Sequence, residues 1–284
     1  MSLTLVQAWT AARQRLMAAG VDSPVIDARM LVEAAAGATR TDIVTDPHRL
    51  LSAGQAEALE TLVARRERRE PISQILGRKG FWNIELKVSG EVLTPRPETE
   101  LLVERALTLL TEDREAQILD LGAGSGAILL AILHERPFAQ GLGVEVSPAA
   151  LALAQANAAA LGLASRSRFV PGDWTAGLAA DAFDLVVSNP PYISSGDIAG
   201  LDPEVRDFEP RLALDGGPDG LDAYRALAPE ILRVLKPGGR FLLEVGQGQA
   251  RRVKQMMTRA GGTGIEAHRD LSGIERVVAG GKSS

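Results

Sequence analysis

The amino-acid sequence predicts an α/β domain with a mostly parallel sheet, preceded by a small helical domain. The first observation is a change of pattern: residues 1–85 alternate helical apolar patterns with turn signals, whereas later apolar runs of strand length alternate with helical patterns. That alternation is typical of a parallel sheet with helices on both faces. The second observation is that glycine-rich or polar motifs follow several predicted strands, where ligands bind in such sheets.

Three helical segments are predicted in the first domain, residues 1–80. Near the N-terminus, apolar residues repeat at helical spacing at Leu3, Leu5, Ala8 and Ala12. Ser23 offers an N-cap and Pro24 a first-turn residue for the next helix. Residues 52–69 are amphipathic and end in an arginine run at 65–69. The run predicts a solvated helix face, or alternatively a docking surface for an acidic partner or nearby RNA.

Residues 81–96 are predicted to form a hairpin or linker, and the second domain covers residues 97–284. A helix is expected from Pro97, because Glu98 and Glu100 would then lie in the first turn and complement the helix dipole. Residues 240–245 are predicted to form a strand. Residues 276–279 are predicted to form a last edge strand, antiparallel to its neighbours.

A strand running into a glycine loop is the first motif of this second domain. Residues 118–121 are mainly apolar, and the loop that follows consists of Gly122, Ala123, Gly124, Ser125 and Gly126. Glycines allow a tight turn and close approach of the backbone to a ligand, and the helix expected at 127–133 supplies free N–H groups. The spacing is G-x-G-x-G, which differs from the dinucleotide-binding G-x-G-x-x-G.

Two further strand ends carry candidate ligand-binding side chains. Glu145 lies 25 residues after Asp120, at the end of the next predicted strand, where its carboxylate could accept hydrogen bonds from both ribose hydroxyls. The alternative is a solvated loop acid. Asp173 could accept from the amine of an adenine ring, and Trp174 could form a wall for that ring. The alternative is a plain turn with Trp174 in the core.

The motif Asn189-Pro190-Pro191-Tyr192 ends another apolar run, residues 183–188. Each proline removes a backbone donor and holds the preceding residue in extended geometry. The side-chain carbonyl of Asn189 and the backbone carbonyl of Pro190 can therefore be fixed as two acceptors, which suits a planar NH2 group. Tyr192 could lay its ring on a flat substrate. The alternative is a proline-rich turn leaving a strand.

Residues 194–220 form a long connection rich in Gly, Asp and Pro. Long ordered connections are often lids or binding loops, and the alternative is a mobile insertion.

Composition excludes some classes of site. The chain has no cysteine, so it has no disulfide, thiolate metal site or cysteine nucleophile. His48, His134 and His268 are scattered and belong to no motif, so no metal site is expected. No signal pattern and no apolar run of membrane-spanning length is found, and a soluble cytoplasmic enzyme is expected.

The order of the motifs resembles the S-adenosylmethionine-dependent methyltransferases of the Rossmann-like class I. The Asn-Pro-Pro-Tyr motif narrows the resemblance to enzymes that methylate amino or amide nitrogen. Three other blocks extend it over nearly the whole chain: residues 71–77 with Phe81-Trp82, residues 92–100, and residues 209–214 with 216–221. Together they are similar to the peptide chain release factor N5-glutamine methyltransferases, the HemK/PrmC family.

That resemblance implies a seven-stranded, mostly parallel sheet and methylation of the glutamine side-chain amide in the Gly-Gly-Gln motif of release factors. S-adenosyl-L-methionine would be the cofactor and S-adenosyl-L-homocysteine its product. Catalysis would involve Asn189, Pro190 and Tyr192, with Pro191 completing the substrate site. The cofactor would contact the glycine loop, Glu145, Asp173, Trp174 and Asn189. From its separate helical pattern and its lack of a chemical motif, the first domain is expected to recognise the release factor. No direct nucleic-acid partner and no membrane is expected, and the enzyme is expected to be a monomer.

The sequence departs from the family pattern at two places, and two other functions are alternatives. Glu145 stands where many relatives carry Asp, and Ile274-Glu275 stands where Arg-Asp is expected. One alternative function is an adenine-N6 or guanine-N2 nucleic-acid methyltransferase, which would need a basic target-binding surface. The pI of about 5.4 counts against it. The other is a non-catalytic cofactor-binding subunit, which the intact glycine loop and Asn-Pro-Pro-Tyr motif disfavour.

Overall fold

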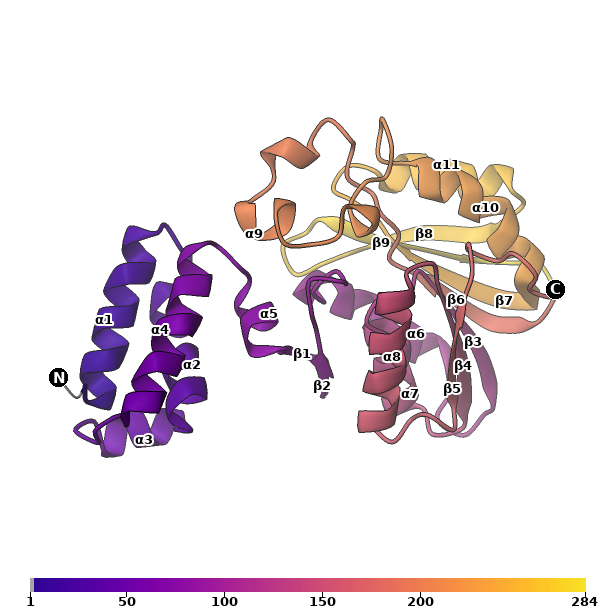
Figure 1. Cartoon of the computed structure of the whole chain (residues 1–284). Coiled ribbons are helices and arrows are strands. Elements are labelled where there is room, and N and C mark those ends of the chain that lie inside the picture. Colours follow the sequence, from indigo (N-terminus) through magenta and orange to yellow (C-terminus); the bar gives the residue numbers. More distant parts are fainter. Residues whose placement is uncertain (1–2) are drawn as a thin grey trace. The chain divides into compact units, whose positions relative to one another are not determined.

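The computed structural model describes residues 3–284 and divides into two compact units (Figure 1). The helical unit consists of the chain up to Gly77 together with Asp202–Phe208, and the sheet unit consists of Arg78–Leu201 and Glu209–Ser284. The first division lies a few residues before the predicted domain end at residue 80. The return of residues 202–208 to the helical unit has no counterpart in the sequence prediction.

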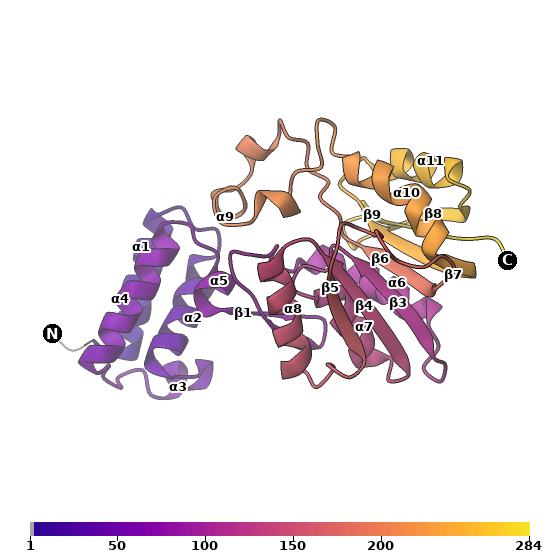
Figure 2. The same ribbon diagram turned by 45° about the vertical axis from the view of Figure 1, so that its right-hand side comes forward.

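The helical unit packs its helices around one apolar core. Its helices are α1 (Leu5–Ala18), α2 (Pro24–Ala36), α3 (Arg40–Thr45), α4 (Ala53–Glu67), α5 (Ile72–Leu76) and α9 (Pro203–Arg206). Figure 2 shows α1, α2 and α4 side by side. Their core includes Leu5, Leu16, Leu31 and Val63. Capping boxes start α1, α3 and α4, whereas Ser23 precedes α2 without a capping hydrogen bond from its side chain.

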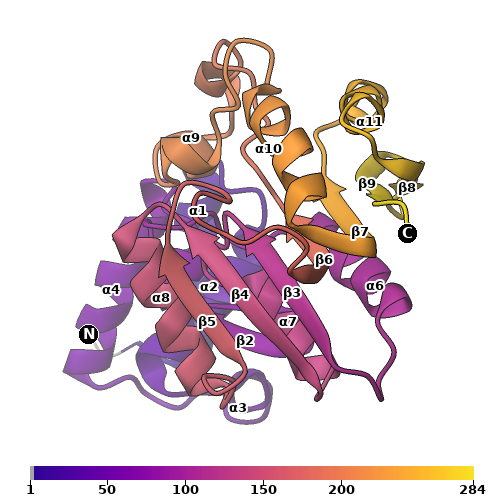
Figure 3. The same cartoon turned by 90° about the vertical axis from the view of Figure 1, so that its right-hand side faces the viewer.

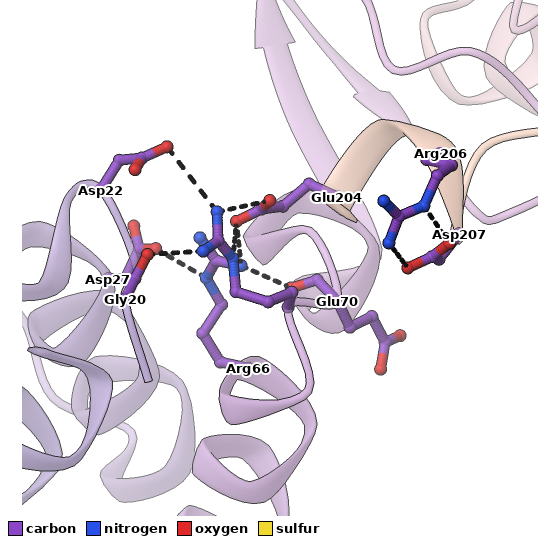
Figure 4. A network of polar contacts seen from close by, with 9 residues as sticks. Gly20, Asp22, Asp27, Arg66, Glu70, Glu204, Arg206 and Asp207 are labelled. Carbon is purple, nitrogen blue, oxygen red and sulfur yellow. Dashed lines mark hydrogen bonds and ion pairs between the residues drawn. The ribbon is translucent and has the colours of Figure 1, made fainter. Parts of the chain in front are cut away.

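The arginine run is largely paired within the helical unit (Figure 4). Arg66 is 5% exposed, and its Nε donates to Asp27 Oδ2 at 2.8 Å. Glu204 of α9 accepts from Arg66 Nη1 at 3.1 Å and from Arg69 Nε at 2.6 Å. Arg65 pairs with Glu70. The prediction of a solvated arginine face is therefore wrong for these residues, because their charges hold α9 and neighbouring helices together.

Over residues 3–284, the sheet unit contains a two-stranded hairpin and a seven-stranded sheet. The hairpin pairs β1 (Arg78–Phe81) with β2 (Ile84–Lys87). The large sheet has the order β5 (Ser167–Pro171), β4 (Ala139–Glu145), β3 (Ala116–Leu121), β6 (Phe183–Ser188), β7 (Leu235–Glu244), β9 (Glu275–Gly281) and β8 (Thr263–Arg269). Figure 3 shows its parallel strands side by side. Strands β5 to β7 are parallel and β9 and β8 are antiparallel, which confirms the predicted fold class.

The prediction for the last strand is half right. Strand β9 is antiparallel, as expected, but it lies inside the sheet between β7 and β8. The edge strand on this side of the sheet is β8, which has no counterpart in the sequence prediction. Its sequence contains Glu266, His268 and Arg269, and most of its residues are at least partly exposed. A strand with this little buried apolar surface gives only a weak period-two signal.

Each face of the large sheet carries its own apolar core. Ile118, Leu185 and Leu242 face a core formed with α6 (Glu100–Leu109), α7 (Ala127–Glu135) and α8 (Pro148–Ala160). Their strand neighbours Leu119 and Val186 face a second core formed with α10 (Asp222–Val234) and α11 (Ala250–Arg259). Successive strand residues point to opposite faces, which explains why the strands are apolar throughout.

Three short 3-10 helices lie in the described part of the sheet unit. Helix η1 (Pro97–Thr99) precedes α6, and η2 (Ile198–Gly200) and η3 (Arg211–Ala213) lie in the connection between β6 and α10. None of the helices in residues 3–284 combines the length and the apolar character that a membrane span requires.

Candidate active site

A cavity of about 420 Å³ lies at the carboxyl ends of the parallel strands in the sheet unit. Strands β3 and β6 are neighbours, although the chain visits β4 and β5 between them, so this edge is the switch point of the sheet. The predicted site residues that line the cavity are Gly122, Ala123, Gly124, Ser125, Glu145, Asp173, Trp174, Asn189 and Pro191. Gly126, Pro190 and Tyr192 do not belong to its lining.

The glycine loop follows β3 and leads into α7. Gly122, Gly124 and Gly126 have φ values of 73°, 54° and 80°, which favour glycine. At Gly126 a Cβ atom would also lie 3.0 Å from Leu130 Cδ1 and from Phe169 Cζ. The N–H groups of Gly122 and Ala123 donate to the carbonyl of Val144, which fastens the loop to β4. The loop is therefore held close to the sheet with its backbone open to the cavity.

Glu145 ends β4 and is held by two backbone donors. Its Oε2 accepts from Gly124 N and its Oε1 from Ser147 N, both at 2.8 Å, and the residue is 8% exposed. Each carboxylate oxygen has a second lone pair. The carboxylate is thus oriented in advance and can still accept hydrogen bonds from a pair of hydroxyl groups in the cavity.

Asp173 and Trp174 follow β5. Trp174 lies both in the cavity wall and in the apolar core, which were predicted as alternatives. Trp174 lines the cavity, and its ring is 3.5 Å from the position of a Cβ on Gly122. The same ring packs against the second apolar core. Asp173 is exposed and also lines the cavity. Trp174 therefore serves as a cavity wall and as part of the core.

Asn189 begins the motif after β6, and its side chain is oriented by a neighbour. Its Nδ2 donates to Thr99 Oγ1 at 3.3 Å. Its Oδ1 is buried and has no hydrogen-bond partner in the protein. A buried acceptor without a partner is costly, so this oxygen marks a position where a ligand donor would be favourable.

Tyr192 lies behind the cavity wall. Its hydroxyl is 3.4 Å from Glu244 Oε1, and burial raises the pKa of Tyr192. Gln249 Nε2 donates to the carbonyl of Tyr192 at 2.8 Å. Gly216 fits closely here, because a Cβ would lie 2.7 Å from the carbonyl oxygen of Pro191. The motif is thus supported from behind by residues that return from the long connection.

The sequence blocks at residues 92–100 and 209–214, for which no role was predicted, meet at the cavity rim. Arg96 Nη2 donates to Glu209 Oε2 at 2.5 Å, and Thr94 N donates to Glu209 Oε1 at 3.3 Å. Glu209 is buried, and this burial raises its pKa. Arg96 lines the cavity together with Pro210, Leu212 and Ala213. The long connection therefore contributes part of the wall, and this part is ordered.

Sequence reasoning missed Thr99 and Glu244. Thr99 lies within the block at residues 92–100, and Glu244 ends β7. Glu244 is 2% exposed, and burial raises its pKa to about 7. A signal for Glu244 was available, because it is a carboxylate at the end of a predicted strand, as Glu145 is.

The walls fit the cofactor that the sequence resemblance implies. S-adenosylmethionine needs a backbone cradle, a carboxylate for its ribose and an apolar wall for its adenine, and the cavity offers each of these. The loop glycines adopt positive φ values that the cradle needs, and a Cβ on Gly122 would lie 3.5 Å from the ring of Trp174. Among residues 3–284, no cluster of His, Cys, Asp and Glu is arranged to hold a metal ion.

Known proteins resemble the chain over both units. A model of the PrmC N-terminal domain matches residues 7–77, and a methyltransferase small domain matches residues 97–200. A methyltransferase from Pyrococcus furiosus has the same fold over 78% of this chain and 99% of its own, with a TM-score of 0.54 and 17% identity.

Curated relatives match at much higher identity. The release factor glutamine methyltransferase of Caulobacter vibrioides is 59% identical over 100% of this chain and 98% of its own length. That of Rhodospirillum rubrum is 50% identical over 93% of this chain and 81% of its own length. Identity of this extent, together with the site at the switch point of the sheet, shows that the chain belongs to the release factor glutamine methyltransferase family.

Proposed function

We propose that this chain transfers a methyl group from S-adenosylmethionine to the side-chain amide nitrogen of glutamine in the Gly-Gly-Gln motif of peptide chain release factors. Its family membership supports the substrate. The observation that carries the chemistry is Asn189, which lines the same cavity as the glycine loop and Glu145 and whose buried Oδ1 has no hydrogen-bond partner in the protein. This oxygen can accept a hydrogen bond from an N–H group, and a glutamine side-chain amide has two N–H groups.

The cofactor is bound by the glycine loop, Glu145, Asp173 and Trp174. Glu145 accepts from the ribose hydroxyls with the lone pairs that Gly124 N and Ser147 N leave free. Trp174 covers one face of the adenine, and Asp173 accepts from its amine. When bound, the cofactor supplies an electrophilic methyl group on a sulfonium centre.

The amide nitrogen of glutamine is a weak nucleophile, and we assign its activation to Asn189 and Pro190. The lone pair of an amide nitrogen is delocalised into its carbonyl. If Asn189 Oδ1 and the Pro190 carbonyl accept the two N–H bonds, they raise the electron density on nitrogen and aim its lone pair at the methyl group. Such positioning can contribute up to about 7–11 kcal/mol in favourable cases. With the cofactor bound, the methyl group would leave sulfur as it bonds to nitrogen, and the proton that nitrogen then loses would pass to solvent water.

No histidine base is required by this mechanism. Among the described residues, the cavity lining contains no histidine. The acceptors that hold the N–H groups are suited to stabilise positive charge as it develops on nitrogen. Pro191, which lines the cavity, limits the space in which the amide plane can rotate, and Tyr192 supports the motif from behind.

We assign recognition of the intact release factor to the helical unit. We expect the enzyme to be a monomer in the cytoplasm. The cofactor-binding and amide-binding residues all belong to the sheet unit. The helical unit carries none of these groups but has a core of its own. It is therefore free to provide contacts with the protein substrate.

Mass spectrometry of a release factor incubated with the enzyme and S-adenosylmethionine tests this function. We expect a gain of one methyl group on the glutamine of Gly-Gly-Gln, and none on a release factor whose glutamine is replaced by glutamate. Parallel incubations with DNA and RNA test the nucleic-acid alternative. Methylation of nucleic acid without methylation of the release factor would overturn the proposal.

A further inference from the structure

Among residues 3–284, Arg96 is the only cationic side chain that lines the cavity. The acidic residues of the lining are Glu91, Glu145 and Asp173. The cofactor proposed for this cavity brings positive charge of its own, on a sulfonium and on an ammonium group. A further cation close to these groups would be repelled unless it also meets an anion. Arg96 therefore calls for an anionic ligand group.

The two proposed ligands contain one anionic group between them. The glutamine side chain and its glycine neighbours present amide groups, which carry no net charge. S-adenosylmethionine ends in the carboxylate of its methionine part, while Glu145, Asp173 and Trp174 serve its ribose and adenine. We propose that Arg96 binds the methionine carboxylate of S-adenosylmethionine. This inference rests on the proposed function and adds a cofactor-binding residue to it.

The glycine loop has few donors left for that carboxylate. Its N–H groups largely donate within the protein already, namely those of Gly122, Ala123, Gly124 and Gly126. Their acceptors are the carbonyls of Val144 and Ala123 and the carboxylate of Glu145. A carboxylate can accept about four hydrogen bonds. A side chain with several N–H groups is therefore needed to satisfy it.

Arg96 has such donors to offer. Within residues 3–284 the structure gives this side chain one acceptor, Glu209, whose Oε2 accepts from Arg96 Nη2 at 2.5 Å. The Arg96 side chain is 35% exposed. The part of its fork that Glu209 does not use is available to a ligand in the cavity. Parallel N–H bonds from a guanidinium to a carboxylate are short and strong, and they fix the orientation of the ligand.

Arg96 is held through its backbone and through its side chain. It lies between Pro95 and Pro97 with extended backbone angles, φ −99° and ψ 148°, and a residue before proline favours this geometry. The Glu209 side chain is only 1% exposed and also accepts from Thr94 N at 3.3 Å. An arginine that is oriented in advance loses little side-chain freedom when the ligand binds.

The alternative is a purely structural role, in which Arg96 only compensates the buried charge of Glu209. That role predicts that a substitution of Arg96 loosens the cavity wall and weakens every cofactor-like ligand alike. Binding of the carboxylate predicts a loss only for a ligand that has this group. A pair of ligands that differ in the carboxylate alone distinguishes the two roles.

Calorimetry with S-adenosylmethionine and its decarboxylated form is this test. The two ligands share the adenine, the ribose, the sulfonium and the ammonium group. We expect Arg96→Met to weaken binding of S-adenosylmethionine roughly 10- to 100-fold, as for the loss of hydrogen bonds between charged groups. Affinity for the decarboxylated form should not fall, because that ligand brings no anion and has a larger net positive charge.

Arg211→Met is the matched control. Arg211 is an exposed arginine two residues after Glu209, it pairs with Asp215, and it does not belong to the cavity lining. This variant loses the same charge and should bind both ligands as the wild type does. Arg96→Lys keeps the charge but not the planar fork, so it should recover only part of the affinity for S-adenosylmethionine.

A double variant removes the effect of an unpaired carboxylate on the fold. Arg96→Met leaves Glu209 buried without its partner, which is destabilising. Glu209→Gln in the same chain removes that charge. The loss should still be selective for S-adenosylmethionine in the double variant, and circular dichroism checks that each variant is folded.

These measurements need no release factor, so they are independent of methyl transfer. Binding of S-adenosylmethionine without methylation of a release factor would contradict the proposed substrate and would leave the role of Arg96 to the calorimetry. Equal losses for both ligands, or unchanged affinity of Arg96→Met for S-adenosylmethionine, would overturn the inference. Weaker binding of a Gly-Gly-Gln peptide by Arg96→Met with unchanged cofactor affinity would overturn it too, because Arg96 would then face the substrate.

Discussion

Asn189 shows how a single residue can separate catalysis from cofactor binding. Asn189→Ala removes the buried acceptor but leaves the glycine loop and Glu145 unchanged. If the acceptor acts mainly as charge develops on nitrogen, the rate should fall by ~10²–10³ in single-turnover assays of a Gly-Gly-Gln substrate. Cofactor affinity measured by calorimetry should change far less.

The fold of Asn189→Ala needs a control, because Asn189 precedes two prolines and its backbone could relax. Circular dichroism provides it. Asn189→Asp is the complementary variant: it keeps an acceptor but adds a negative charge beside a sulfonium, so we expect tighter cofactor binding with slower transfer. A wild-type rate in a correctly folded Asn189→Ala enzyme would contradict the mechanism.

Glu145 is predicted to contribute to binding rather than to the chemical step. Glu145→Ala should weaken S-adenosylmethionine binding by ~1.5–3 kcal/mol through lost hydrogen bonds to a charged group. Because this carboxylate also holds Gly124 N and Ser147 N, part of the loss would come from a looser loop. Glu145→Gln keeps the shape but replaces one acceptor oxygen by an NH2 group, so it should lose one of these two backbone hydrogen bonds together with the charge. Unchanged affinity in Glu145→Ala by calorimetry would remove this residue from the cofactor site.

At the scale of elements, the Glu204 carboxylate connects α9 to the helical unit, because it accepts hydrogen bonds from Arg66 and Arg69. Burial alone would raise the pKa of Glu204, but hydrogen bonds from Arg69 and Arg66 outweigh this effect, and the net result is a lowered pKa. A group with a lowered folded-state pKa stabilises the protein above its unfolded-state pKa of about 4.3. This contribution is lost as the pH falls through the folded-state value.

Glu204→Gln should therefore loosen α9. Arg66 would keep Asp27 but lose its second carboxylate in a buried position, and we expect the free energy of unfolding of the helical unit to fall by about 1–3 kcal/mol. Hydrogen exchange of peptides that cover Asp202–Phe208 should increase at neutral pH. The matched control, Glu104→Gln, removes an exposed partner of Arg105 and should leave this exchange unchanged. Equal protection in both variants would show that the ion pairs do not hold the segment.

The elements themselves could largely be predicted from local patterns. The strands β3 and β6 are short, strongly apolar runs with glycine or proline motifs at their ends, so the fold class and the cavity residues of these motifs follow from the sequence. Strand β8 was missed because its residues are too polar to show a period of two. Thr99 was missed because its hydroxyl faces Asn189, which is distant in the chain, and only the folded chain reveals that contact.

At the scale of the whole molecule, the chain passes between the two units three times. It leaves the helical unit after Gly77, returns at Asp202 and leaves again after Phe208. The residues that follow, Pro210, Leu212 and Ala213, line the cavity. The helical unit therefore includes residues 202–208 of the long connection, and the residues of the connection that line the cavity come directly after them. The sequence could not predict this, because the attachment depends on ion pairs between residues more than a hundred positions apart.

A chain that begins at Arg78 tests what the helical unit contributes. Arg78 is chosen as the start because β1 begins there. The sheet unit has its own two cores and all the predicted cofactor residues, so we expect this shortened enzyme to fold and to bind S-adenosylmethionine. It should lose methylation of the intact release factor, because the proposed recognition unit is absent.

A short peptide that contains Gly-Gly-Gln separates recognition of the release factor from ordering of the wall. If the helical unit only recognises the protein substrate, the shortened and full-length enzymes should methylate the peptide at the same rate. We expect a lower rate in the shortened enzyme, because Asp202–Phe208 has lost the arginines that hold it. Full-length Glu204→Gln should show a smaller fall on the peptide while its helical unit is still present. Circular dichroism and cofactor calorimetry establish that the shortened chain is folded, and full activity of that chain on the intact release factor would show that the helical unit is dispensable.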